Sequence, residues 1–562
     1  MPGGLQPLNF QLSIFDGIDP GVTAGGSKGG FGSFRIQDPA GDLDYLIGKV
    51  MSGGTLTLLR GAPGALYSTF TAVATLTSAG MVYDHQVKEI RVRDLGWKLD
   101  VPLHDNRYGG AGGADGDAAI KSVLKPYTIG QVFNVAPVLI EASKLIYQLS
   151  DSAITSIADV RDGGYSLTFG TTRADYAAMA GSAPAKGNYD VCLPAGLIRL
   201  GSSPAHDITV DFTGDKTGGG SAYLKRGDIA NQVATRAGTT IAVNSSALSA
   251  LNSAQTGTCG FHWLNEITKR QALDEVMAGI AGYHYVNLSG ELVLGYLAAP
   301  TGSAVATYTW PTDVADLPSQ MDAYQEPRWK TTLGYQRNYA LQDRSKLAGA
   351  VGQALKFRPT LIDGTKNIYQ ITDSRTPAIT SIAAVRDAGS SLTTGTSRAD
   401  YTALAGTAPS AGAYDYCLAA GLIRLGSAPT GDVDVDFTST ITEAAGALYG
   451  QEAQWVTGET SSQRTYWPTA PEVKLFSGFY GSSDASTEAS RQKTLFQGFP
   501  TGSMIERYKV KLRDDPFTLA GYLGQVIEIA AYPRYSWANP RKFLLVGVEF
   551  SGDATTTATL WG

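Results

Sequence analysis

Three carboxylates on one face of a predicted strand are the first candidates for chemistry in this sequence. The stretch DVDVDF places Asp432, Asp434 and Asp436 at a period of two, and alternate side chains of a strand share a face. Three carboxylates side by side could bind Ca²⁺. The apolar residues between them also fit an ordinary half-buried strand with its carboxylates in solvent. The matching stretch at 207–212 has one carboxylate fewer, and we favour the half-buried strand.

A cysteine and a histidine offer a second possibility, because both side chains bind zinc. Cys259 and His262 are three residues apart, but a structural zinc needs four ligands and no further pair stands at a suitable spacing. The other cysteines are Cys192 and Cys417, which occupy matching positions of a repeat. Three cysteines make no disulfide framework. We predict small buried thiols, with no metal and no cofactor.

Signatures of catalysis are hard to find in the sequence. It contains no HExxH zinc motif, no phosphate-binding GxxxxGK[ST] loop and no CxxC pair. The glycine-rich run YGGAGGADGD does not fit GxGxxG and is predicted to be a loop. The five histidines are scattered, although sequence distance leaves a spatial triad open. We predict no catalytic residues and no enzymatic activity.

A repeat is the most informative pattern of the chain. At an offset of 225, residues 154–212 and 379–437 are identical at about 41 of about 59 positions, far above chance. After a shift of three residues, PVLIEASKLIYQLSD before the first copy also matches PTLIDGTKNIYQITD before the second. The sequence therefore predicts two compact units inserted into a larger framework: module A over residues 137–213 and module B over residues 359–438.

Inside each module the pattern favours short strands. ITSIADVRDGG predicts a strand closed by a turn at residues 162–164, and RADYAAMAG predicts one or two helical turns. LIRLG and DITVDF predict two further strands. Each module is therefore expected to be a small β unit.

The framework around the modules mixes helices and strands. We predict helices over residues 228–238 with Asp228 as N-cap, over residues 268–282, and from a candidate cap at Asp484. YHYVNLSGELVLGYL predicts a hairpin with its turn at residues 289–290. ERYKVKL, KFLLVGVEF and TTTATLWG predict strands near the C-terminus.

Composition agrees with a turn-rich, mainly β, multidomain protein. Its 562 residues include 66 glycines and 28 tyrosines, and only 17% are charged. A net charge of −6 without a basic run argues against a nucleic-acid partner. No apolar stretch is long enough to cross a bilayer, and the N-terminal segment lacks the pattern of a signal peptide.

Four stretches of the framework carry a resemblance to a known family. FGSFRIQDPAGDLDYLIG, ALDEVMAGIAGYHYVNLSGELVLGYLAAP, LGYQRNYALQ and YLGQVIEIAAYPRYSWANPRKFLLVGVEFSGDATTTATLWG resemble tail-tip or baseplate hub proteins of long-tailed bacteriophages and of gene transfer agents. The resemblance covers most of the chain. It implies hub-like β-barrel or β-sandwich domains with a small α+β insert. We expect an N-terminal β domain (1–136), module A, a central α+β domain (214–358), module B and a C-terminal β domain (439–562).

The resemblance also implies a function and partners. It implies a structural virion protein at the distal end of the tail, assembled in the host cytoplasm. The chain would form a ring, with a trimer favoured over a hexamer, in contact with the distal tail protein, the tape measure protein and a central spike or fibre. Some related hubs bind an iron–sulfur cluster through four cysteines. With three cysteines we expect no cluster here, and no peptidoglycan-hydrolase motif is carried over.

The symmetry of phage tails suggests why one chain carries two modules. Tail tubes of this kind have sixfold symmetry, so three chains with two similar modules each could imitate six subunits. An alternative is a receptor- or glycan-binding adhesin for host cell attachment, in which the matched Tyr176, Tyr189, Tyr401 and Tyr414 stack on sugars. A third possibility, a polysaccharide-degrading tail enzyme, would need paired carboxylates in a cleft, which the sequence does not identify.

Overall fold

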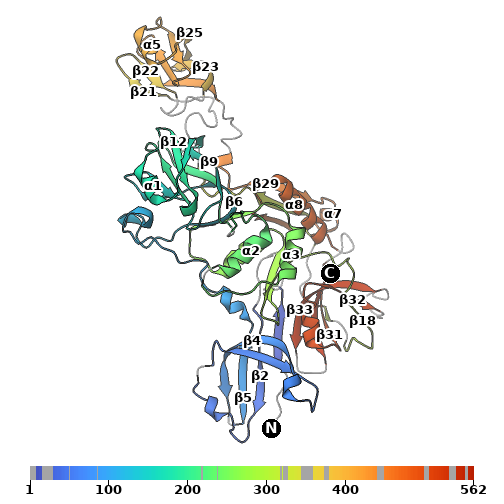
Figure 1. Cartoon of the computed structure of the whole chain (residues 1–562). Coiled ribbons are helices and arrows are strands. Elements are labelled where there is room, and N and C mark those ends of the chain that lie inside the picture. The colour runs from blue at the N-terminus through green and yellow to red at the C-terminus, as the bar shows by residue number, and fades with distance from the viewer. Residues whose placement is uncertain are drawn as a thin grey trace.

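A framework of β-sheets carries the two modules in the computed structural model. It describes residues 8–14, 29–49, 51–84, 86–216, 219–236, 238–316, 319–320, 327–342, 359–371, 379–439, 448–498, 505–530, 540–550 and 555–562. The fold is mainly β and multidomain, as predicted. No described helix has the length and apolar character to cross a membrane. Figure 1 shows module A in teal beside the central helices, and module B in orange set off from them.

The largest sheet joins the two ends of the chain. Its strand order is β19-β31-β34-β33-β1-β2-β5-β4-β3, and β32 pairs with β33 and with β18. Its strands are β1 (Asn9–Ser13), β2 (Phe31–Gln37), β3 (Thr55–Arg60), β4 (Thr71–Tyr83), β5 (Val87–Arg93), β18 (Ala306–Thr309), β19 (Ser319–Gln320), β31 (Arg507–Leu512), β32 (Val526–Ala530), β33 (Arg541–Phe550) and β34 (Thr556–Trp561). The predicted N-terminal and C-terminal β domains thus share one sheet, while the domain boundaries remain predictions.

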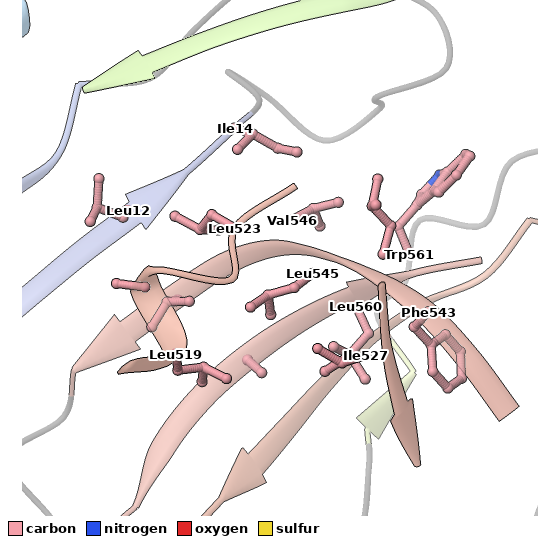
Figure 2. Packing of buried hydrophobic residues seen from close by; sticks show 14 of the residues in the cluster. Leu12, Ile14, Leu519, Leu523, Ile527, Phe543, Leu545, Val546, Leu560 and Trp561 are labelled. Atoms are coloured by element: carbon pink, nitrogen blue, oxygen red, sulfur yellow. The ribbon is translucent and has the colours of Figure 1, made fainter. Parts of the chain in front are cut away.

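One hydrophobic core stabilises this joint. Leu12 and Ile14, from the N-terminal end, pack against Leu545, Leu560 and other residues of the C-terminal strands (Figure 2). β31 alternates as predicted, with Tyr508, Val510 and Leu512 buried. Burial of apolar surface from both ends favours their association, because each buried methylene contributes about 0.8 kcal/mol.

The central part packs helices against short strands. It contains β15 (Gly260–Trp263), β16 (Gly282–Val286), β17 (Leu292–Tyr296), β20 (Lys330–Tyr335), β29 (Gln454–Glu459), β30 (Glu472–Phe476), α2 (Arg226–Thr235), α3 (Ser245–Ala254), α4 (Lys269–Ala278), α7 (Gln463–Tyr466), α8 (Ser482–Phe496) and α9 (Pro516–Ala520). α2 contacts both α3 and α4 in a shared core, and β16 and β17 form the predicted hairpin. Single 3₁₀ turns occur at Asp44–Leu46, Tyr67–Thr69, Leu95–Leu99, Gly113–Asp115, Ala118–Ile120 and Leu193–Ala195.

Four predicted helix limits were wrong, although the helices exist; one of them is the end of α2, which lies at Thr235 and not at 238. α2 begins after Lys225, so Asp228 lies in its first turn and accepts a hydrogen bond from Asn252 of α3 at 2.7 Å. α8 begins after Gly481, which also places Asp484 in a first turn, where the helix dipole favours an anion. α4 ends at Ala278 and not at 282. The sequence marked the first turns correctly but not the capping residues.

Module A is a pair of sheets packed face to face. Its elements are β7 (Val138–Glu141), β8 (Ile146–Gln148), β9 (Ser156–Asp162), β10 (Tyr165–Ser166), β11 (Thr168–Thr172), α1 (Tyr176–Gly181), β12 (Asn188–Cys192), β13 (Leu197–Leu200) and β14 (Ile208–Thr213). One sheet has the order β11-β12-β13-β8-β7. The other has the order β10-β9-β14-β6-β15, in which β6 (Tyr127–Val135) precedes the predicted module and β15 belongs to the central part. Module A is therefore continuous with the framework.

Module B repeats these elements with the same pairing. They are β21 (Thr360–Asp363), β22 (Ile368–Gln370), β23 (Ile379–Asp387), β24 (Ser390–Ser391), β25 (Thr393–Ser397), α5 (Tyr401–Gly406), β26 (Ala413–Cys417), β27 (Leu422–Leu425) and β28 (Val433–Ser439). The sheet β21-β22-β27-β26-β25 matches its counterpart strand for strand, but the second sheet is β24-β23-β28. Both buried clusters of module B consist of its own residues.

Candidate functional site

An ion pair at the same position of both modules is the most specific polar feature of the duplication. In module A, β9 supplies Arg161 and β14 supplies Asp211, and both side chains are less than a tenth exposed. Arg161 Nη1 donates to Asp211 Oδ1 at 2.8 Å, a second guanidinium nitrogen contacts Oδ2, and Arg161 Nε lies 2.9 Å from Asp159 Oδ2. Such a bidentate pair holds the two neighbouring strands β9 and β14 together through its geometry as well as its charge.

Aromatic rings complete the surroundings of Arg161. Its guanidinium lies 5.4 Å from the ring centroid of Phe133 on β6 and 5.5 Å from that of Tyr449, and these two rings stack on each other. Burial alone would lower the pKa of Arg161, but its hydrogen bond and charge contact with Asp211 raise it above the ordinary value. The cation is therefore permanent, and it fastens module A to two separate segments of the framework.

The counterpart pair in module B lies closer to solvent. Arg386 Nη2 donates to Asp436 Oδ2 at 2.5 Å, with side chains that are 23% and 20% exposed. The hydrogen bond raises the pKa of Arg386. Within the described part of the chain, no ring takes the place that Phe133 and Tyr449 hold in module A. The same two strands are thus paired in both modules, whereas among the described residues the aromatic clamp is found at module A.

The three carboxylates of DVDVDF do not form a common cluster. Asp436 is bonded to Arg386, Asp434 is partly exposed and Asp432 is exposed. Across the described ranges, no group of three or more His, Cys, Asp or Glu could hold a metal. The strand is half-buried, as favoured from the sequence.

Cys259 and His262 belong to the buried interior. The Cys259 thiol donates to the Gly257 carbonyl oxygen at 3.5 Å, and His262 Nδ1 lies 2.7 Å from Thr128 Oγ1 on β6. Burial, together with the charge of Arg337, lowers the pKa of His262 to about 3, so its ring is neutral. The remaining cysteines, Cys192 and Cys417, are also buried and free, as expected for small apolar side chains.

The matched tyrosines divide into two kinds. Tyr189 and Tyr414 are buried in the module cores and cannot present a ring to a sugar. Tyr176 starts α1 and donates to Glu141, while Tyr401 starts α5 and donates to Asp363 at 3.2 Å. Of these four tyrosines, Tyr176 and Tyr401 have the exposed side-chain surface that an adhesin-like contact needs.

Module B exposes an apolar patch of three side chains. In module A the framework covers the counterpart of Ile362, whereas Leu139, the counterpart of Leu361, is 38% exposed. Leu361 and Ile362 of β21 and Tyr401 of α5 are 51%, 48% and 43% exposed. Ile140, the counterpart of Ile362, is completely buried beside Tyr108 from the segment that precedes module A. Because exposed apolar clusters favour contact with other proteins, this patch is the clearest candidate for a partner contact. The sequence could not reveal it, since the repeat keeps the same residue types in both environments.

An open cleft in the framework offers no catalytic groups. It has a volume of about 770 Å³ and lies between α3, the β16–β17 hairpin and α9, with Tyr283, Tyr285, Tyr296 and Phe517 in its wall. Its described lining contains no Asp, Glu, His, Cys, Lys or Arg. Burial raises the pKa of Tyr285 to about 12, so this phenol stays protonated near neutral pH. The lining offers neither a general acid–base pair nor an activated nucleophile.

No protein-family model and no curated protein matches the chain. Among solved structures, the chain is similar to the 43 kDa tail protein of prophage MuSo2 from Shewanella oneidensis, with a TM-score of 0.36 and 9% identity over 99% of this chain and 94% of that one. It is similar to a tail protein from Neisseria meningitidis, with a TM-score of 0.33 and 10% identity over 99% and 91%. It is also similar to a prophage tail protein from Listeria monocytogenes, with a TM-score of 0.28 and 7% identity over 99% and 87%. At TM-scores of 0.36 and lower, these similarities assign neither a family nor a function.

The sequence missed the residues that matter most at the modules. It pointed to the aspartates of the last strand but not to Arg161 and Arg386, their partners. A signal was present, because both copies contain the tetrad motif V-R-D followed by Ala or Gly at the same repeat position. The clamp by Phe133 and Tyr449 had no sequence signal, since those residues are more than 300 positions apart.

Proposed function

We propose that this protein is a structural component of a long-tailed bacteriophage virion, located at the tail tip or baseplate. In this proposal it forms a hub ring, with a trimer favoured, that joins the tail tube to the central spike or fibre. The observation that carries the proposal is the duplication: two modules with the same strand pairing sit on one β framework. A symmetric assembly can use such a pair, because two similar modules in each chain double the number of similar contacts around a ring.

The framework supports this role physically. The largest sheet ties both ends of the chain into one core, so force on either end is transmitted through strand pairing and not through a loop. The stretches that resemble hub proteins lie largely in this framework and its neighbours, including residues 31–48 and 272–300. The resemblance supplies the proposed partners: the distal tail protein, the tape measure protein and the spike or fibre.

The modules supply the proposed match of symmetry. A ring of three chains carries six modules, and the two modules of each chain share an arginine–aspartate contact between equivalent strands. The exposed patch of Leu361, Ile362 and Tyr401 gives module B a surface for a neighbour, whereas in module A the counterpart of Ile362 is already covered by its own chain. In this proposal all six modules of the ring contact the sixfold tube, and copies of module A and module B alternate around it.

Electron microscopy of purified particles tests the proposal directly. Gold-labelled antibodies raised against a module B peptide should bind at the distal end of the tail, around its circumference. Reconstruction of that region should then resolve three copies of the chain. Labelling along lateral fibres would favour the adhesin, and a ring of six chains would remove the reason for two modules per chain.

A further inference from the structure

A closed loop of the framework covers one end of module A. The loop spans residues 106–125, and its ends meet because the backbone N–H of Lys125 donates to the carbonyl oxygen of Asn106 at 2.8 Å. A β-bridge between Arg107 and Leu124 joins the same two ends. Compact surface loops whose ends lie close together are packed by their own residues. The cover of module A is therefore a unit that is closed by contacts within itself.

Two side chains of this loop complete a small core of module A. Tyr108 is 1% exposed and belongs to one buried cluster with Ile140 of β7 and Met179 of α1. Ile120 of the loop and Tyr176 of α1 pack against the same cluster. An aromatic and an aliphatic side chain from the loop thus remove the apolar surface of this end of module A from water, which favours the contact.

Two hydrogen bonds from one aspartate fix the loop on β7. The backbone N–H of Asp117 donates to the carbonyl oxygen of Ile140 at 2.9 Å. Oδ2 of Asp117 accepts from the backbone N–H of Ala142 at 3.0 Å. Both contacts on the side of module A are made by the backbone, so a strand of the same shape with other side chains presents the same acceptor and donor.

Module B repeats this surface in an exposed form. Ile362, the counterpart of Ile140, is 48% exposed, and Tyr401, the counterpart of Tyr176, is 43% exposed. Gly364, which takes the place of Ala142, is exposed as well. Counterparts of the remaining core residues still form a buried cluster, namely Ile368, Leu404, Cys417 and Leu422. The core that the loop completes in module A is thus present in module B with its outer side open to solvent.

The repeat carries the surface twice but the loop once. At the offset of 222 that relates Pro137 to Pro359, Tyr108 corresponds to Lys330. Lys330 begins β20, which pairs with β29 and β30 of the framework. The stretch at the corresponding distance before module B therefore serves another purpose. Because exposed apolar surface favours contact with other proteins, we expect the second loop from a neighbour.

We propose that the exposed end of module B binds a loop of a neighbouring protein that has the chemistry of residues 106–125. The loop adds an aromatic side chain to the cluster of Ile362 and Leu404, as Tyr108 does in module A. An aspartate of the loop donates its N–H to the carbonyl oxygen of Ile362 and accepts from the N–H of Gly364, because β21 keeps the register irregularity of β7 at this point. That the neighbour is a tail protein rests on the proposed function, whereas the chemistry of the contact rests on module A.

A cyclic peptide of residues 106–125 tests this recognition with the full-length protein. Head-to-tail closure reproduces the contact between Asn106 and Lys125 and reduces the loss of conformational freedom on binding. The fluorescently labelled peptide should bind saturably in an anisotropy titration, with a Kd of about 100 μM or lower. Module A should not compete, because its own loop is tethered beside it at a high effective concentration. No saturable binding would overturn the proposal.

Substitutions locate the binding site on the protein and the anchors on the peptide. Ile362→Asp should weaken binding by at least about tenfold, because it places a charge in the contact. Leu66→Asp is the matched control: Leu66 is 75% exposed in the N-terminal part and lies outside the patch, so the Kd should not change. In the peptide, Tyr108→Ala and Asp117→Ala should each weaken binding. Equal effects of Ile362→Asp and Leu66→Asp would contradict the proposed site.

Other outcomes separate this contact from rival occupants and from the proposed function. Self-association of the protein that Ile362→Asp abolishes would make a second copy the occupant and overturn the proposal. Peptide binding at the patch without antibody label on phage tails would support the contact and remove the tail role. Label at the tail tip without peptide binding would remove the contact alone.

Discussion

Arg161 and Asp211 form a buried bidentate ion pair across β9 and β14, and two aromatic rings from the framework cover the arginine. The same pair recurs as Arg386 and Asp436 in module B with more exposure to solvent. One sequence unit therefore occupies two environments within one chain. This difference makes the matched positions of the two modules internal controls for each other.

Loss of the arginine should cost more in module A than in module B. Arg161→Met leaves a buried carboxylate without its cation, and we expect a loss of about 3–5 kcal/mol in the free energy of unfolding. Arg386→Met should cost less, about 1 kcal/mol, because the side chain of Asp436 is 20% exposed and that of Asp211 only 8%. Urea unfolding followed by circular dichroism measures both variants. Equal costs would mean that the framework rings do not shield the pair.

The two modules should unfold in different transitions. Phe212 and Phe437 are equivalent and almost completely buried, but the core around Phe212 continues into β6 while that around Phe437 is confined to module B. Phe437→Ala should lower the free energy of unfolding of module B by about 3–5 kcal/mol. Its calorimetric transition then moves to a lower temperature, while the main transition, that of the framework, stays unchanged. Phe212→Ala should instead lower the main transition. A single transition that both substitutions shift alike would show that module B is coupled to the framework.

Gly130 and Gly187 both have a positive φ, but substitution by alanine should destabilise the protein to different extents at the two positions. Gly130 has φ +76° and faces the Cys259 carbonyl oxygen, whereas Gly187 has φ +82° and open space around the position of a Cβ. Gly187→Ala should cost about 1 kcal/mol from the left-handed conformation alone. Gly130→Ala adds a clash between strands β6 and β15 and should cost several times more. The shift in urea midpoint separates the two effects, and similar shifts would count against a close approach of these strands.

Mild acid should destabilise the protein through His262. Its pKa is lowered to about 3 by burial, while an unfolded histidine titrates near 6.5. The unfolded state therefore binds a proton that the folded state does not, so stability falls as the pH drops below about 6.5 and continues to fall towards 3. Between pH 7 and pH 5 this group alone should cost about 2 kcal/mol.

The variant His262→Gln provides the comparison for this pH effect. It can still bond to Thr128 Oγ1 but cannot titrate, so its loss of stability over the same interval should be smaller by that amount. Urea midpoints at several pH values provide the test. Parallel pH curves for the two proteins would show that the ring of His262 is already charged or accessible in the folded state.

Much of the local structure was predictable because it rests on short-range patterns. The alternation of Tyr508, Val510 and Leu512 located β31, and the glycine at 290 located the hairpin turn between β16 and β17. The caps at Asp228 and Asp484 were wrong, because first-turn and capping positions both favour acidic residues. Propensity alone does not distinguish positions three residues apart.

The sequence by itself determined that the chain is mainly β, that one small unit occurs twice, and that the last strand of this unit alternates apolar and polar residues. These properties follow from periodicity and identity along the chain. Only the tertiary structure decided that β1 joins the C-terminal strands, that β6 enters the sheet of module A, and that Phe133 and Tyr449 meet over Arg161. Strand pairing and ring contacts over hundreds of residues depend on which edges and faces find each other in space, and no local pattern encodes that choice.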